Sequence, residues 1–156
     1  MAIISPASVH EFVRQSNLIE GMEQVLGREV KAHLKIFSTE RLEVIDIEKF
    51  VSACAPTHKL RKNKGMNVWV GQTYKAPDGG PEILERLRYL LEQINRLELN
   101  PWQAHCEYEM LHPFTDGNGR SGRAIWAWHI MQRGGDPFSL PFLHRWYYDT
   151  LSNYRK

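Results

Sequence analysis

The sequence contains little cysteine and no long uncharged apolar stretch, and both shortages narrow the class of protein. Its two cysteines, Cys54 and Cys106, stand outside any metal-type spacing, which favours reduced, packed thiols over a disulfide framework or a zinc finger. No apolar run is long enough to cross a bilayer, and the chain has no internal repeat or low-complexity segment. We therefore expect neither a membrane protein nor a repeat array.

A strong excess of charge of one sign is also missing, since 20 Lys and Arg stand against 18 Asp and Glu. The basic residues gather mainly over 59–64, a cluster too short to predict nucleic-acid binding. The first residues, Met1 to Pro6, lack the basic and apolar regions of a secretion signal. We expect a cytoplasmic protein without nucleic-acid or membrane partners, and its export as an effector stays open.

The length of 156 residues and the apolar share of 42% suit one domain over 1–156 with a single core. Helical signals recur along the chain, so the sequence predicts a mainly α fold, a compact helical bundle. Asp46 is expected to cap one helix and Asn100 precedes the proline that opens another. The expected helices open at Ser5-Pro6 and run over 22–37, 46–54, 81–97, 101–112 and 139–154, and another contains the apolar stretch 124–131 and stops at Gly134-Gly135.

One segment differs from these helices. Residues 67–74 alternate in polarity, are rich in β-forming residues and contain Gly71 at the position of a turn. They predict a small β-hairpin directly before the helix that opens at Pro81.

The run from His112 to Arg123 reads His-Pro-Phe-Thr-Asp-Gly-Asn-Gly-Arg-Ser-Gly-Arg and leads into an apolar helix. Gly117 and Gly119 let successive amides curl into an anion-binding nest at the helix start, where the dipole favours a phosphate. Arg120 and Arg123 are candidates to clamp that phosphate, because their planar forks match its oxygens. The run therefore predicts a phosphate site.

Three other side chains of the run have separate candidate roles. His112 titrates near neutrality and can accept a proton from an incoming hydroxyl. Asp116 is a single carboxylate, which is how Mg²⁺ is held when substrate phosphates supply other ligands. Phe114 is the apolar side chain expected to anchor the loop in the core. Together these parts describe nucleotide-dependent transfer to a hydroxyl.

The run resembles the signature of the Fic family, His-Pro-Phe-x-(Asp/Glu)-Gly-Asn-Gly-Arg-x-x-Arg, and matches every specified position. The resemblance implies the Fic fold and transfer of AMP from ATP to a Ser, Thr or Tyr hydroxyl of a target protein. It implies that Asn118 and its neighbouring amides hold the α-phosphate and that Arg123 orients the γ-phosphate. The related Doc branch has lysine at the position of Gly119 and transfers a phosphoryl group, so glycine here favours AMP transfer.

A second motif, Ser16-Asn17-Leu18-Ile19-Glu20-Gly21, resembles the family's inhibitory pattern (Ser/Thr)-x-x-x-Glu-(Gly/Asn), with Ser16, Glu20 and Gly21 at its fixed positions. By that resemblance residues 1–21 form an inhibitory N-terminal segment ahead of a Fic core over 22–156. Glu20 would pair with Arg123 and block seating of the γ-phosphate. The segment between Glu20 and the signature is short, which leaves open whether the two side chains meet.

The hairpin resembles the Fic flap, which holds a target segment beside the active site by strand addition. The residues assigned to this role are Asn67, Val68, Trp69, Val70 and Gly71. The aromatic C-terminal stretch resembles the helix that closes the nucleotide pocket, through Trp146, Tyr147, Tyr148 and Leu151.

The sequence thus predicts an ATP- and Mg²⁺-dependent protein adenylyltransferase, with a homodimer left open. One alternative keeps the site and changes the donor, to UMP, GMP, phosphoryl or phosphocholine transfer. Another is a non-catalytic interaction module that binds nucleotide. A zinc site of His105, His112 and Asp116 is a third, although no acidic helper stands at metalloprotease spacing.

Overall fold

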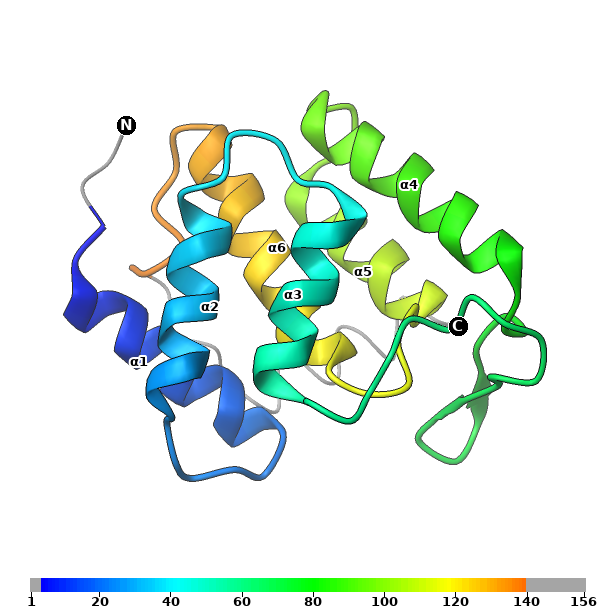
Figure 1. The fold of residues 1–156 in the computed structure, drawn as a ribbon. Coiled ribbons are helices and arrows are strands. Elements are labelled where there is room, and N and C mark those ends of the chain that lie inside the picture. The colour runs from blue at the N-terminus through cyan, green and yellow to red at the C-terminus, as the bar shows by residue number, and fades with distance from the viewer. Residues whose placement is uncertain (1–3, 140–156) are drawn as a thin grey trace.

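A computed structural model describes residues 4–139 of the chain, and the expected helix over 139–154 with its aromatic residues lies outside that range. The described part contains six helices and one two-stranded hairpin (Figure 1), so the prediction of a mainly α fold is confirmed. The elements are α1 (Pro6–Ile19), α2 (Gly27–Phe37), α3 (Val44–Cys54), β1 (Trp69–Val70), β2 (Tyr74–Lys75), α4 (Pro81–Asn95), α5 (Pro101–Leu111) and α6 (Asn118–Gln132). None of the described helices has the length and apolar character needed to span a membrane.

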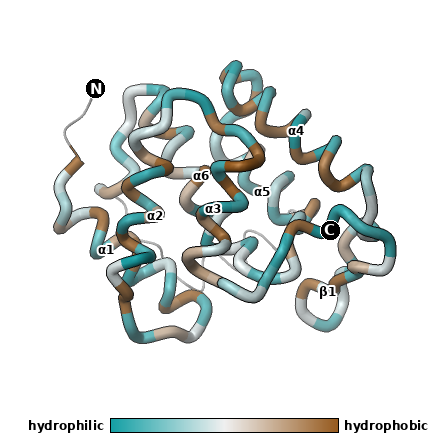
Figure 2. Tube along the Cα trace, viewed as in Figure 1, coloured by the Kyte–Doolittle hydropathy of each residue, from teal (hydrophilic) through white to brown (hydrophobic). Residues whose placement is uncertain are grey.

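Helix α6 is the centre of the bundle and contacts α1, α2, α3 and α5 (Figure 1). Its side chains are buried on nearly every face, which explains why it lacks the one-sided apolar stripe of a surface helix. Apolar and polar residues alternate along the outer helices (Figure 2), and many of the apolar ones pack into the core. The active-site candidates on α6 therefore stand on the most enclosed element of the fold.

The helix starts follow the expected proline and cap signals. Pro6, Pro81 and Pro101 each stand in the first turn of a helix, where the missing amide hydrogen costs nothing. Asn100 caps α5, since its side-chain oxygen accepts a hydrogen bond from the Gln103 amide at 2.7 Å.

Two predicted helix starts were wrong by several residues. The helix expected from Met22 begins at Gly27, because the Glu29 carboxylate accepts from the Leu26 amide at 2.8 Å and so caps the helix there. Glu43, not Asp46, is the N-cap of α3, and Asp46 instead accepts a hydrogen bond from the Glu43 amide at 2.8 Å. In both cases the acidic residue stands three positions inside the helix and bonds backwards.

The predicted hairpin is confirmed. Strands β1 and β2 pair antiparallel, with Trp69 opposite Lys75 and Val70 opposite Tyr74. Gly71 begins the turn with φ +65°, a left-handed conformation that favours glycine. The Tyr74 hydroxyl donates to the carbonyl of Met110 at 2.9 Å and ties the hairpin to the end of α5. The indole of Trp69 is left 61% exposed.

A buried histidine makes the stability of this core sensitive to acid. His33 is fully buried, packs edge-on against Phe50 at a ring separation of 4.7 Å, and donates from Nδ1 to the Glu29 carbonyl at 2.6 Å. Its Nε2 has no hydrogen-bond partner among residues 4–139. Burial lowers the pKa of His33 from 6.5 to about 4.

Between these two pH values the unfolded chain binds a proton at His33 that the folded chain does not. The free energy of unfolding should therefore fall as the pH drops from 6.5 to 4, by about 3 kcal/mol from this residue. Urea unfolding at several pH values would measure this decrease in the free energy of unfolding. His33→Phe is the comparison variant, because it lacks the contribution of the histidine. Equal pH slopes in the two proteins would refute the assignment to His33.

Candidate active site

The first candidate residue, His112, stands where α5 ends. It adopts left-handed backbone angles, φ 49° and ψ 60°, which turn the chain sharply out of the helix. Its ring nitrogen Nδ1 lies 3.1 Å from the carbonyl oxygen of Glu109. Because a carbonyl only accepts, this contact favours the tautomer with the proton on Nδ1 and the lone pair on Nε2. Nε2 is the nitrogen suited to act as a base.

The loop after His112 is held by a pair of hydrogen bonds from one side chain. Asn118 accepts from the Phe114 amide and donates to the Phe114 carbonyl, both at 2.8 Å. Phe114 is 1% exposed in the core and bridges to Leu60. The Asn118 side chain therefore fixes the loop, which leaves its backbone amide, not its carboxamide, for the expected phosphate contact.

Helix α6 begins at the other end of this loop with its amides directed outward. Gly117 precedes it with φ +83° and provides no side-chain cap, and the first bond inside the helix runs from the Ser121 amide to the Gly117 carbonyl at 3.0 Å. The amides of residues 118–120 precede that bond at the positive end of the helix dipole, an arrangement that favours an anion. A Cβ on Gly117 would stand 3.3 Å from Val51, so glycine also permits the close packing of the loop on α3.

Asp116 lies beside this helix start and is 56% exposed at its side chain. One oxygen accepts from the Gly117 amide at 2.8 Å, and the other lies 3.7 Å from Nε2 of His58. A single exposed carboxylate fits a hard cation that takes its remaining ligands from phosphates and water. Among residues 4–139 no group of three potential ligands gathers, so nothing there supports a zinc site of His105, His112 and Asp116.

Arg123 is buried and bound by the N-terminal segment. Its Nε donates to the Ser16 hydroxyl at 2.8 Å, and its Nη2 donates to the Ser16 carbonyl at 3.0 Å and to Glu20 Oε1 at 2.7 Å. The side chain of Arg123 is 1% exposed and that of Glu20 is 32% exposed. The segment between the two motifs is thus long enough for Glu20 to reach Arg123, which answers the question that the sequence left open.

Two glycines permit this contact. Gly21 has φ +76° and ends α1 directly after Glu20, so that the carboxylate turns back toward α6. Gly119 lies beneath the ion pair, where an added Cβ would collide with Glu20 and stand 2.9 Å from Nη1 of Arg123. The ion pair therefore lies directly on the first turn of α6.

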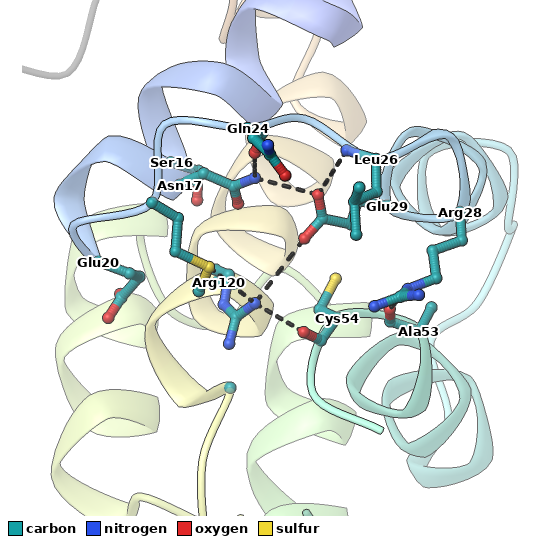
Figure 3. Close-up of polar contacts among 12 residues, drawn as sticks. Ser16, Asn17, Glu20, Gln24, Leu26, Arg28, Glu29, Ala53, Cys54 and Arg120 are labelled. Carbon is teal, nitrogen blue, oxygen red and sulfur yellow. Dashed lines mark hydrogen bonds and ion pairs between the residues drawn. The ribbon is translucent and has the colours of Figure 1, made fainter. Parts of the chain in front are cut away.

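Arg120 has protein partners where the sequence analysis expected a phosphate. Figure 3 shows its guanidinium directed at the Cys54 carbonyl and at Glu29, with distances of 2.7 Å and 3.9 Å. Arg120 is 3% exposed. Its buried charge is thus balanced by groups inside the protein.

Sequence reasoning missed the side chains that form this second contact between α1 and the site. The side-chain amide of Asn17 donates to the Gln24 carbonyl at 2.9 Å and to Glu29 Oε1 at 3.1 Å (Figure 3). The available signal was a charged residue on the buried face of a helix, because Glu29 lies on the same face as His33 and Phe37. Arg123 thus contacts the N-terminal segment directly, and Arg120 is linked to it through Glu29.

Replacing Glu29 by alanine should lower the free energy of unfolding by about 3 kcal/mol, because it leaves the Leu26 and Asn17 donors and the Arg120 charge without their buried partner. Glu29→Gln keeps an acceptor oxygen and should cost less. Urea unfolding of the three proteins measures the difference. A loss below about 1 kcal/mol for the alanine variant would contradict this role.

The polar side chains beneath the site do not offer a nucleophile. Burial raises the pKa of the Cys54 thiol to about 12, so it stays protonated at neutral pH. Burial also raises the pKa of Tyr108, whose hydroxyl lies 2.7 Å from the Ser121 hydroxyl. His112 therefore stays a candidate for proton transfer.

The flap residues lie on the hairpin and its approach. Asn67 accepts a hydrogen bond from the Gly79 amide at 2.9 Å, and the Val68 carbonyl accepts from Ala76 at 3.2 Å. These bonds close the base of the hairpin, so the exposed Trp69 projects from a braced element. Helix α4 begins soon after the hairpin, at Pro81.

Comparison with known proteins adds independent information. The chain is 28% identical over 142 residues to protein adenylyltransferase fic-1 of Caenorhabditis briggsae and 27% identical over 139 residues to that of Caenorhabditis elegans. Each match covers 83% of this chain and 27% of the relative, so the chain spans about a quarter of the length of these curated relatives.

A solved structure of Fic-1 from Caenorhabditis elegans has the same fold, with a TM-score of 0.69 over 99% of this chain and 59% of that one, at 19% identity. The family model for Fic/DOC matches residues 15–130, a range that holds both the N-terminal motif and the complete run from His112 to Arg123. On this match and this fold, the chain belongs to the Fic/DOC family.

Proposed function

We propose that this chain transfers AMP from ATP to a Ser, Thr or Tyr hydroxyl of a target protein, and that Glu20 restrains the reaction. The observation that carries the proposal is the short loop between α5 and α6. It places a histidine with its lone pair on Nε2 at one end and the anion-binding amides of residues 118–120 at the other. The relatives named protein adenylyltransferase support the choice of AMP.

In the proposed reaction, Nε2 of His112 accepts the proton of the target hydroxyl as its oxygen bonds to the α-phosphorus. The bond from that phosphorus to the oxygen bridging to the β-phosphate breaks, and pyrophosphate leaves. The amides of residues 118–120 stabilise the charge on the phosphate oxygens, and Arg123 orients the γ-phosphate. Base catalysis by a positioned histidine contributes on the order of 10²–10⁴-fold.

A divalent cation, Mg²⁺, would be held by Asp116 together with the phosphates of ATP, and it would neutralise charge on the triphosphate. The His58 ring lies 3.7 Å from the second oxygen of Asp116. Asp116 keeps its other oxygen on the Gly117 amide, so the carboxylate faces the helix start where the phosphates would lie.

The restraint follows from competition for one guanidinium. Glu20 occupies Nη2 of Arg123 at 2.7 Å and brings a negative charge to the place where a γ-phosphate would lie. ATP can bind productively only after Glu20 moves away, and its partial exposure at 32% gives the side chain room to do so.

The hairpin gives the target a docking edge. We propose that an extended segment of the target pairs with the hairpin backbone, where main-chain hydrogen bonds bind it without a strict sequence requirement. The exposed Trp69 would add apolar contact beside the modified residue.

The test is a labelling assay with ATP that carries the label on either the α- or the γ-phosphate. Purified protein and cell lysate are incubated with each, using the wild type and the Glu20→Gly variant. Label from the α-position alone supports AMP transfer. Label from the γ-position alone would assign the chain to phosphoryl transfer, and label from neither position, with ATP bound, would reject ATP as the donor.

A further inference from the structure

Arg61 is a fully buried arginine that the proposed chemistry does not use. Its guanidinium donates to four backbone carbonyls. Nε donates to His112 at 2.7 Å and Nη2 to Leu111 at 2.9 Å, while Nη1 donates to Met66 at 3.0 Å and to Pro77 at 2.8 Å. These carbonyls come from two separate parts of the chain, the end of α5 and the two sides of the hairpin.

The end of α5 compensates the buried charge. Leu111 and His112 supply carbonyls at the negative end of the helix dipole, where a cation is favoured. The backbone of Arg61 takes part as well, since its amide donates to the Pro113 carbonyl at 2.8 Å and its carbonyl accepts from the Gly80 amide at 2.9 Å. One residue thus joins the signature loop to the start of α4.

The contact with His112 holds an unfavourable backbone conformation. His112 has φ 49°, and the left-handed region costs a residue with a side chain about 1 kcal/mol. Arg61 Nε bonds to the carbonyl of this same residue and so stabilises the turn that aims the imidazole. If the turn relaxed, the ring would leave its position over the Glu109 carbonyl.

The contacts with Met66 and Pro77 brace the hairpin from both sides. Met66 precedes β1 and Pro77 follows β2, and one nitrogen, Nη1, bonds to both of their carbonyls. From the strand side, the Tyr74 hydroxyl adds a bond to the Met110 carbonyl at 2.9 Å. The hairpin is therefore fixed relative to the end of α5 by Arg61 and, secondarily, by Tyr74.

We propose that Arg61 is a positioning residue that sets the distance between the hairpin and the imidazole of His112. This inference rests on the proposed function, in which the hairpin holds the target segment and His112 accepts the proton of its hydroxyl. Arg61 is fully buried and acts through the two parts it joins. A displacement of about 1 Å at a reacting hydroxyl is enough to slow a reaction on the order of 10²-fold.

Lysine cannot replace this arginine. The guanidinium presents five donors in a rigid plane, which is why its three nitrogens can reach carbonyls on two sides at once. A lysine ammonium keeps the charge but carries its three donors on one nitrogen, so it cannot bond to all four carbonyls of the α5 end and the hairpin. Arg61→Lys is therefore the informative variant.

The kinetic test uses the Glu20→Gly protein as parent. Arg61→Lys should lower kcat for the target about 10- to 100-fold while the Kd for ATP, measured by calorimetry, stays within about twofold, because the amides of residues 118–120 and Arg123 are unchanged. The control is Arg133→Lys, which alters another arginine that donates to two carbonyls, those of Leu97 and Leu99, outside the site. Similar losses of kcat in both variants, or a matching loss of ATP affinity, would overturn the proposal.

A second variant and a second measurement guard against a folding defect. Tyr74→Phe removes the hydroxyl that donates to the Met110 carbonyl and should lower kcat about 3- to 10-fold with ATP affinity unchanged. The ¹⁵N resonances of the His112 ring should show a proton on Nδ1 in the parent, and loss of that fixed tautomer in Arg61→Lys would support positioning even if no target is ever labelled. Unchanged ring resonances in Arg61→Lys would overturn it, whether or not AMP transfer occurs.

Discussion

In a Glu20→Gly background, replacing His112 by alanine is expected to lower the rate of AMP transfer on the order of 10²–10⁴-fold while ATP binding changes little. In the proposed reaction the imidazole would accept the hydroxyl proton while its Nδ1 is held against the Glu109 carbonyl, whereas the α6 amides and Arg123 would hold the nucleotide. Transfer is measured with α-labelled ATP, and binding by calorimetry.

The matched control is His10→Ala, which removes an exposed histidine on α1. It should leave both quantities at the parent value. If His112→Ala lost ATP affinity and transfer in parallel, the histidine would be a structural residue of the α5 terminus, and the base would have to be sought elsewhere.

Replacing Glu20 by glycine in the wild type is expected to raise the rate of transfer about 10- to 100-fold. A hydrogen bond between charged groups contributes about 1.5–3 kcal/mol, and each 1.4 kcal/mol corresponds to a tenfold change in the fraction of Arg123 available to a γ-phosphate. We use the full range of this free energy because Arg123 is 1% exposed, so solvent does not strongly screen its interaction with Glu20.

Two further variants separate charge from shape. Glu20→Gln keeps the size of the side chain and loses its charge, so it should raise the rate less than glycine does. Glu11→Gln removes another α1 glutamate that pairs with an arginine, Arg14 at 2.6 Å, on the solvent side, and should change nothing. Equal rates for the wild type and Glu20→Gly, with equal ATP affinity, would remove the regulatory role from Glu20.

Prediction from sequence worked best where the structure follows from local patterns of consecutive residues. The mainly helical class, the proline-opened helices and the hairpin follow from local patterns, and the structure confirms them. The predicted helix starts at Met22 and Asp46 were wrong. Glu29 and Asp46 each stand at the third position of a helix, where their carboxylates bond back to the N-cap amide. Such a role depends on the path of the preceding loop, which periodicity does not reveal.

The two arginines of the signature could not be distinguished from the local sequence. From sequence both had the same candidate role, since each is an arginine near the start of one helix. In the structure Arg123 faces Ser16 and Glu20, while Arg120 faces Cys54 and Glu29. The two side chains stand three apart, at neighbouring positions on the surface of α6, and only the packing of α1, α2 and α3 decides which partners each one meets.

By itself the sequence determined the fold class, the family and the order of the parts of the site, because a base, a carboxylate and a glycine nest in one loop keep their spacing wherever the loop lies. Only the tertiary structure decided that Glu20 meets Arg123 at 2.7 Å and that Arg61 joins His112 to the hairpin. These contacts link residues far apart in the chain, and their geometry follows from how the helices pack around α6.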